Sequence, residues 1–144
     1  MKTRKRRSFC PMSSALDRIG DKWSLLIVRD ILLRGKRTHG EFRASSEGIA
    51  TNILGDRLAW LEQEGIVSRE ADPADARREI FSLTQKGVDF LPVLLALSEW
   101  SAKYDVAFAG GPMRDRVSRL NEDMRGLLKN NAAGVDLRGG RTIF

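Results

Sequence analysis

The sequence predicts a mainly α-helical fold with one small β-hairpin. Between residues 11 and 64, apolar residues recur every three or four positions, which is the spacing of helices with one buried face. From Ile66 to Leu83, apolar and polar residues alternate on either side of the segment 72–78, which indicates two strands joined by a turn. The helical spacing returns from residue 85 onward.

The size and composition of the chain favour a basic, soluble, single-domain protein. Its 144 residues are enough to bury a hydrophobic core. The 25 Lys and Arg residues outnumber the 19 Asp and Glu residues, and the net charge of +6 favours an anionic partner such as nucleic acid or a membrane surface. No apolar signal segment follows the basic N-terminus, and the apolar runs LLIV and LPVLLAL are too short to span a bilayer. Together with the single cysteine, this predicts a cytoplasmic protein without a disulfide framework or a membrane partner.

The N-terminal half predicts a flexible basic arm, residues 1–9, followed by four helices. Pro11 suits the start of the first helix, and Asp21 is the expected N-cap of the second. Gly20, Gly35 and Gly65 are expected to follow the ends of the first, second and fourth helices. The four expected helices span about residues 11–19, 22–34, 39–44 and 50–64.

The C-terminal half predicts two further helices. Thr84 is the expected N-cap of a long helix over Gln85–Phe108 with a kink at Pro92. Residues 88–97 of this helix are apolar on nearly every side, so we expect one side to face the core and the other a partner. After a break at 110–112, a last helix carries a heptad-like apolar seam of Met113, Val117, Leu120, Met124 and Leu127.

These patterns divide the chain into the arm, a winged helix domain with a dimerisation helix over residues 10–108, and a C-terminal helix with a flexible tail over 109–144. We expect a homodimer held by the Gln85–Phe108 helix with help from the Met113–Leu127 seam, and with the first helix also in the dimer contact. Trp23, Trp60 and Trp100 share helical spacing with other apolar residues, which favours core packing or dimer contact over a ligand cage. The residues expected at the dimer contact are Leu91, Leu94, Leu95, Trp100, Leu120 and Met124.

Three helices followed by a two-stranded wing are the plan of a winged helix-turn-helix domain, in which one helix enters the major groove of DNA. The fourth helix is the expected recognition helix. Its buried stripe consists of Leu54, Leu58 and Leu61. Its opposite face carries short side chains that permit close approach to DNA, namely Asn52, Gly55, Asp56 and Ala59. Asn52 can pair with an adenine edge, and the alternative is an ordinary solvated helix face.

Several motifs resemble one family of regulators. The stretches CPMSSALDRIGDKWSLLIVRDIL, GIATNILGDRLAWLEQEGIVSRE and FSLTQKGVDFLPVLLALSEW closely resemble the HxlR-type branch of MarR-like bacterial transcription regulators. The Cys-Pro before the first helix, the Gly-x-Lys-Trp opening of the second and the Ser-Leu-Thr-x-x-Gly after the wing carry the resemblance, which spans about residues 10–104. It implies a homodimeric winged helix-turn-helix regulator that binds pseudo-palindromic operators.

The chain departs from that family's pattern at two places. Thr38 and His39 stand where members usually have an Arg-Phe pair leading into the third helix. Ala50, followed by Thr51, stands where members often have a Ser or Thr that caps the recognition helix. Both changes touch the surface expected to face DNA, so the resemblance implies the docking mode rather than individual contacts.

Nine residues are candidate DNA contacts. Arg77 and Arg78, expected at the wing tip, are candidates for the minor groove or for phosphates, and Arg57 is placed to reach a phosphate or to pair with an acid such as Glu41. The N-terminal run of Lys2, Arg4, Lys5, Arg6 and Arg7 either follows the DNA backbone or forms a solubilising arm. The nine candidates are Thr51, Asn52, Gly55, Asp56, Arg57, Arg77, Arg78, Lys36 and Arg43.

Cys10 is a candidate redox switch. It directly precedes Pro11 at the start of the first helix, where the positive helix terminus and the upstream arginines favour a thiolate. Many regulators of the HxlR type carry a cysteine at this place, and some use it to sense oxidants or electrophiles. The alternative is an inert, small apolar residue. With no second cysteine in the chain, any disulfide must join two chains or a chain and a small thiol.

The expected function is a transcriptional regulator, with repression as the expected sign, that binds double-stranded DNA and responds to an oxidant, an electrophile or an unknown small ligand. One histidine, His39, and one cysteine provide no ligand cluster, so no metal and no cofactor are expected. No phosphate-binding loop, nucleophile elbow or carboxylate pair supports an enzyme. The main alternative is a winged-helix module that binds protein, and an RNA binder is a third reading that lacks exposed stacking aromatics.

Overall fold

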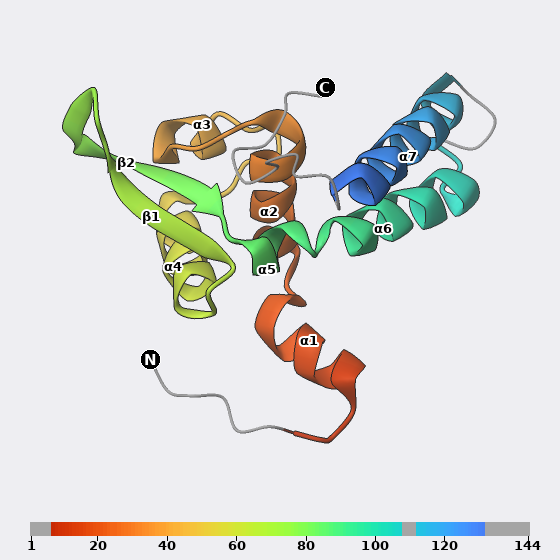
Figure 1. Cartoon of the computed structure of the whole chain (residues 1–144), viewed down its shortest axis with the longest axis horizontal. Coiled ribbons are helices and arrows are strands. Elements are labelled where there is room, and N and C mark those ends of the chain that lie inside the picture. The colour runs from red at the N-terminus through yellow and green to blue at the C-terminus, as the bar shows by residue number, and fades with distance from the viewer. Residues whose placement is uncertain (1–6, 108–111, 132–144) are drawn as a thin grey trace.

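The structure is a computed structural model that describes residues 7–107 and 112–131, with the backbone only for residues 113, 114 and 127–131 (Figure 1). The contacts predicted for Lys2, Arg4, Lys5 and Arg6, the ends of the heptad-like seam at Met113 and Leu127, and the predicted tail after residue 131 lie outside this description. In order, the elements are α1 (Pro11–Ile19), α2 (Lys22–Arg34), α3 (His39–Arg43), α4 (Thr51–Gln63), β1 (Val67–Asp72), β2 (Asp75–Leu83), α5 (Gln85–Val88), α6 (Leu91–Tyr104) and α7 (Pro112–Asn131).

The mainly helical fold with one antiparallel hairpin is confirmed, and its elements have a winged helix arrangement. Helices α2, α3 and α4 lie together beside the hairpin, and α6 and α7 lie side by side at the other end of the molecule (Figure 1). The largest buried side chains come from every one of these parts, including Ile31, Leu54, Leu83 and Leu95. They form a single continuous core.

The prediction of one long helix over Gln85–Phe108 is wrong. The chain forms a single turn, α5, which Thr84 caps through its hydroxyl, and then a separate helix, α6, that ends at Tyr104. Pro92 lies in the first turn of α6, where the missing N–H group would have no helical acceptor in any case. Proline therefore starts a new helix here rather than kinking a continuous one.

The wing is longer than predicted, and its turn is tighter. Val67 pairs with Leu83 at its base and Asp72 pairs with Asp75 at its tip, so only Pro73 and Ala74 remain for the turn. Arg77 and Arg78 consequently lie in strand β2 and not in the turn where the sequence placed them. At the base, the N–H of Phe81 donates to the carbonyl oxygen of Arg37 at 2.8 Å, which ties the other edge of β2 to the segment before α3.

The structure changes which residues are available to a second copy of the chain. Five of the residues expected at the dimer contact are buried in the core of the chain itself: Leu91, Leu94, Leu95, Leu120 and Met124. The cause is that α6 and α7 pack against each other and against the rest of the core, so the two helices cover much of each other's apolar surface. Trp100 alone among the six is exposed, with 67% of its surface accessible.

Candidate DNA-binding surface

Helix α4 has the predicted buried and exposed faces. Leu54, Leu58 and Leu61 are buried, whereas Thr51, Asn52, Asp56 and Ala59 are exposed. Trp60 is buried and its indole N–H donates to the carbonyl oxygen of Arg18 at 2.7 Å, which confirms core packing for this tryptophan. Ala50, as the N-cap, gives no side-chain hydrogen bond to the first turn. The N–H groups at the start of α4 therefore have no side-chain cap.

The space around Gly55 is open. It lies in the middle of α4, and a methyl group added at this position would meet no atom of the described residues within 4 Å, apart from the backbone of α4 itself. A glycine inside a helix destabilises it by about 1 kcal/mol relative to alanine. Packing within the described part of the chain therefore gives no reason for a glycine here.

Arg57 pairs with two carboxylates, and neither is Glu41. It donates to Asp56 beside it on α4 and lies 3.6 Å from Asp21, the N-cap of α2. Partial burial raises the pKa of Asp21, but hydrogen bonds from Ser24 and the charge of Arg57 outweigh it and hold the pKa below its usual value. Arg57 thus ties α4 to the start of α2.

Glu41 has a different role from the one proposed for it as a partner of Arg57. Its carboxylate accepts from the N–H groups of Arg37 and Thr38 at 2.6 and 3.0 Å, while the Thr38 hydroxyl accepts from the Glu41 N–H. This is a capping box, and it starts α3. The departure from the family pattern at Thr38 therefore supplies a helix cap. His39 packs edge-on against Phe81, with ring centroids 5.1 Å apart.

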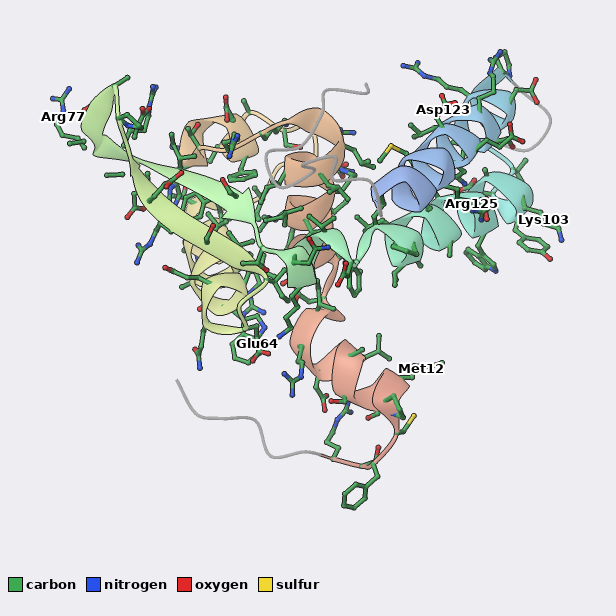
Figure 2. All side chains as sticks on the ribbon, viewed as in Figure 1. Met12, Glu64, Arg77, Lys103, Asp123 and Arg125 are labelled. Atoms are coloured by element: carbon green, nitrogen blue, oxygen red, sulfur yellow. The ribbon has the colours of Figure 1, made fainter. Side chains whose placement is uncertain are left out.

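The two wing arginines differ in how firmly their side chains are bound by the protein. Arg78 donates through two nitrogens to one oxygen of Asp72, at 2.8 and 2.9 Å, and the other Asp72 oxygen accepts from the N–H of Ala74. The Ala74 hydrogen bond and the Arg78 side chain both lower the pKa of Asp72. Arg77 lies at the far end of the hairpin with 91% of its side chain exposed, and its contact is with Asp75 at 3.1 Å (Figure 2). From its place in β2, Arg78 is bound to Asp72 beside the turn, whereas Arg77 extends into solvent.

The remaining basic candidates are less uniform. Lys36 lies 3.6 Å from the buried carboxylate of Asp30, so its charge partly neutralises that acid within the fold. Arg43 is exposed and has no ion-pair partner among the side chains that the structure describes. Arg7, the last residue of the basic run and the only one within the described range, pairs with Asp17 of α1.

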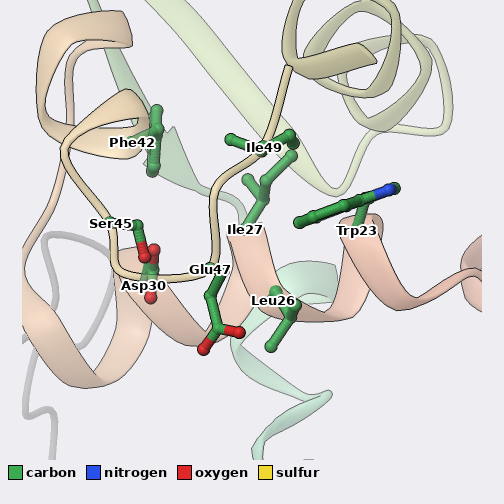
Figure 3. A pocket seen from close by; sticks show the side chains of 8 residues that line it. All are labelled: Trp23, Leu26, Ile27, Asp30, Phe42, Ser45, Glu47 and Ile49. Atoms are coloured by element: carbon green, nitrogen blue, oxygen red, sulfur yellow. The ribbon is translucent and has the colours of Figure 1, made fainter.

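A charge network that the sequence did not reveal supports the connection between α3 and α4. Asp30 on α2 is buried, and Arg29 bridges its carboxylate to Glu47 with distances of 2.7 Å to each acid. Beside this network is a shallow hollow between α2 and the connection, open to solvent, with Ser45 and Trp23 among the residues that line it (Figure 3). Its remaining lining residues are Leu26, Ile27, Asp30, Phe42, Glu47 and Ile49.

Arg37 and Arg69 were also missed. Arg69 on β1 lies between Glu62 of α4 and Glu79 of β2, at 3.2 and 2.9 Å. Arg37 donates to the hydroxyl of Ser82. The sequence places Arg69 on the hairpin across from acidic residues, which is the only indication of its ion pairs. The partners could not be assigned without the register of the two strands.

Cys10 is exposed and is the N-cap residue of α1. Its backbone N–H donates to the Ser8 hydroxyl at 3.2 Å. Across the described ranges 7–107 and 112–131, no group of three or more His, Cys, Asp or Glu side chains is arranged to hold a metal ion. Among the helices described, none is long and apolar enough to cross a membrane.

Comparison with known proteins identifies the family. Residues 18–107 match the family model described as HxlR-like helix-turn-helix. The HTH-type transcriptional regulator YdeP of Bacillus subtilis is 32% identical over 111 residues, which are 77% of this chain and 79% of YdeP. The solved structure of the redox regulator HypR in its oxidized form is similar with a TM-score of 0.59 and 31% identity, covering 67% of this chain and 100% of that one. The reduced form of the transcriptional regulator YodB from B. subtilis has a TM-score of 0.54 and 28% identity, covering 69% and 98%. The chain therefore belongs to the HxlR-like helix-turn-helix family and is a DNA-binding transcriptional regulator rather than an enzyme.

Proposed function

We propose that the protein acts as a homodimer on a pseudo-palindromic operator, with α4 of each copy in the major groove and the wing along the neighbouring backbone. In this arrangement Thr51, Asn52 and Asp56 face base edges, and Arg77 reaches a phosphate or the minor groove. The half-sites are expected about one helical turn apart, roughly 34 Å, because both α4 helices must enter successive major grooves on one side of the DNA.

The exposed apolar stripe of helix α1 is an argument for the proposed dimer. The helix has nine residues and projects from the rest of the chain, and only Ile19 among its side chains is buried (Figure 1). Met12 and Leu16 continue the stripe of Ile19 at helical spacing and are exposed. Isolated helices of this length are unstable in water. So short a helix is stable only if its apolar stripe packs against another surface, and we propose that a second copy of the chain provides this surface.

The placement of α4 in the groove rests mainly on Gly55, a glycine in the middle of the helix that packing within the described chain does not require. We expect Gly55→Ala to raise the free energy of unfolding by about 0.5–1 kcal/mol, because helix propensity improves and no clash arises within the chain. The same methyl group is expected to weaken operator binding about tenfold, because it keeps the helix from approaching the bases closely. Urea unfolding and a mobility-shift titration measure the two effects.

The matched control for that substitution is Gly126→Ala in α7. Gly126 is also inside a helix, and a methyl group there meets no described atom within 4 Å outside the backbone of α7. This variant is expected to gain stability in the same way and to keep its operator affinity. If Gly55→Ala bound the operator as tightly as the unmodified protein, α4 would not be the element that approaches the bases.

The two wing arginines are expected to respond differently to replacement by alanine. Arg77→Ala should weaken binding to cognate and random DNA alike and lower the slope of log affinity against log salt by about 1, because one phosphate contact is lost. Arg78→Ala should lower the urea midpoint, because Arg78 and Asp72 together hold the turn. Equal urea midpoints for the two variants would contradict this division of roles.

Cys10 is proposed as the point at which oxidants act, supported by its exposure and by the similarity to a protein named as a redox regulator. With diamide, two Cys10 thiols of two chains, or one Cys10 and glutathione, form a disulfide while diamide takes up two electrons and two protons to give the hydrazine. We expect operator binding to change after this treatment in the unmodified protein and not in Cys10→Ser. The idea fails if both proteins respond alike.

A further inference from the structure

Asp56 occupies the centre of the exposed face of α4. It follows Asn52 by four residues and precedes Ala59 by three, so the three side chains lie in one row along the helix. Its side chain is 58% exposed. An acidic residue in this row would meet the phosphates and bases of DNA directly if α4 lies in the groove.

The carboxylate of Asp56 is bound by the protein on one side only. Its Oδ2 atom accepts from Arg57, whose guanidinium also lies 3.6 Å from Asp21 and is itself largely covered. No donor among the residues that the structure describes bonds to Oδ1. One oxygen is therefore engaged by Arg57, and the other is available to an external donor.

The major groove offers few donors to such an oxygen. Adenine presents its N6 amino group beside its own N7 acceptor, which repels a carboxylate, whereas cytosine presents its N4 amino group and no acceptor of its own. A carboxylate in the groove is otherwise unfavourable, because the surrounding phosphates carry the same charge. The favourable partner is therefore cytosine.

We propose that Asp56 reads a cytosine in each half-site of the operator, with Arg57 and Asp21 holding its carboxylate in place. This assignment rests on the proposed function, since it requires α4 to lie in the major groove. It also implies that Asp56 lowers affinity for DNA without the cytosine, because the negative charge then has no donor to offset its repulsion.

The test is selection from a randomised DNA library by the unmodified protein, Asp56→Asn and Asp56→Ala. The unmodified protein is expected to prefer cytosine about tenfold at one position of each half-site. Asp56→Ala should lose that preference, keep the others and bind random DNA severalfold more tightly. Asp56→Asn should change the preferred base at the same position from cytosine to adenine, because an amide pairs with the N6 and N7 atoms of adenine.

Glu122→Gln is the matched control, since it removes one negative charge from an exposed position of α7. It should leave both the selected sequence and the affinity for random DNA unchanged. A cytosine preference that persists in Asp56→Ala overturns the assignment while leaving the proposed function intact. An unmodified protein that selects no sequence overturns the proposed function and the assignment with it.

Discussion

Replacing Leu97 by glutamate is expected to separate the proposed homodimer into folded monomers and to lower operator affinity by about 100-fold. Leu97 is 48% exposed on α6 and lies on one face with Val93, Trp100 and Tyr104, all of them exposed. We propose that this face takes part in the dimer contact together with α1. A charge in its middle would then be buried without a partner on association. Once the copies separate, each half-site is bound alone, and the gain from binding both at once, about 10²–10⁴-fold, is lost.

The choice of residue matters for this experiment. From the sequence alone, Leu94→Glu would be the choice for breaking the dimer. This variant is expected to unfold the chain instead, because Leu94 faces the hydrophobic core and is buried there. Leu97→Glu changes only an exposed position. Ser118→Glu, on the exposed side of α7, is the control for an added negative charge and should remain a dimer.

Sedimentation and circular dichroism at micromolar concentration, together with a mobility shift on the operator, provide the measurements. The expected pattern is a native helical signal for Leu97→Glu with half the mass of the unmodified protein. A folded monomer in the unmodified protein itself would contradict the dimer proposal altogether.

The sequence was sufficient for those elements whose ends are encoded locally. Pro11 starts α1, and Asp21 caps α2 by accepting from the N–H of Ser24 at 2.9 Å. Gly35 ends α2 in a left-handed conformation, with φ of 63°. Each of these signals acts within one turn of the chain, so no knowledge of tertiary packing was needed.

The break between α5 and α6 required more than local information. Pro92 is compatible with a kink inside a helix and with the first turn of a new one, and the sequence does not distinguish the two. The same holds for the apolar segment 88–97. Its pattern shows that both sides must be covered, but whether α7 or a second chain covers a given side depends on tertiary packing.

The electrostatic contacts of the site were least accessible from sequence. Arg57 pairs with Asp21, which precedes it by 36 residues in the sequence. The two side chains meet because α4 packs on α2. The wing arginines were predicted as cations free to meet DNA, yet Asp72 and Asp75 lie beside them. DNA phosphates must therefore compete with carboxylates of the protein, which reduces the net gain from each arginine.

The buried carboxylate of Asp30 gives the second large expected effect, because Asp30→Asn should destabilise the fold by about 2–4 kcal/mol. Only 5% of this side chain is exposed, and Arg29, Arg34 and Lys36 lie within 2.7, 3.4 and 3.6 Å of it. Removing the charge leaves three cations close together without their shared anion, which in a buried site costs about 3–5 kcal/mol. The lower value is expected here because the cations keep partial contact with water.

Asp30→Asn should also loosen the connection to the recognition helix. Arg29 bonds to both Asp30 and Glu47, and Glu47 lies in the segment that leads into α4. We expect the contact with Glu47 to weaken once the charge of Asp30 no longer orients Arg29. Amide exchange should therefore become faster in residues 44–50, and operator affinity should fall. Glu99→Gln is the control, since its ion pair with Arg125 at 2.8 Å is exposed and its loss should cost less than about 1 kcal/mol. If urea unfolded Asp30→Asn at the same midpoint as this control, the network would not be what holds the connection against α2.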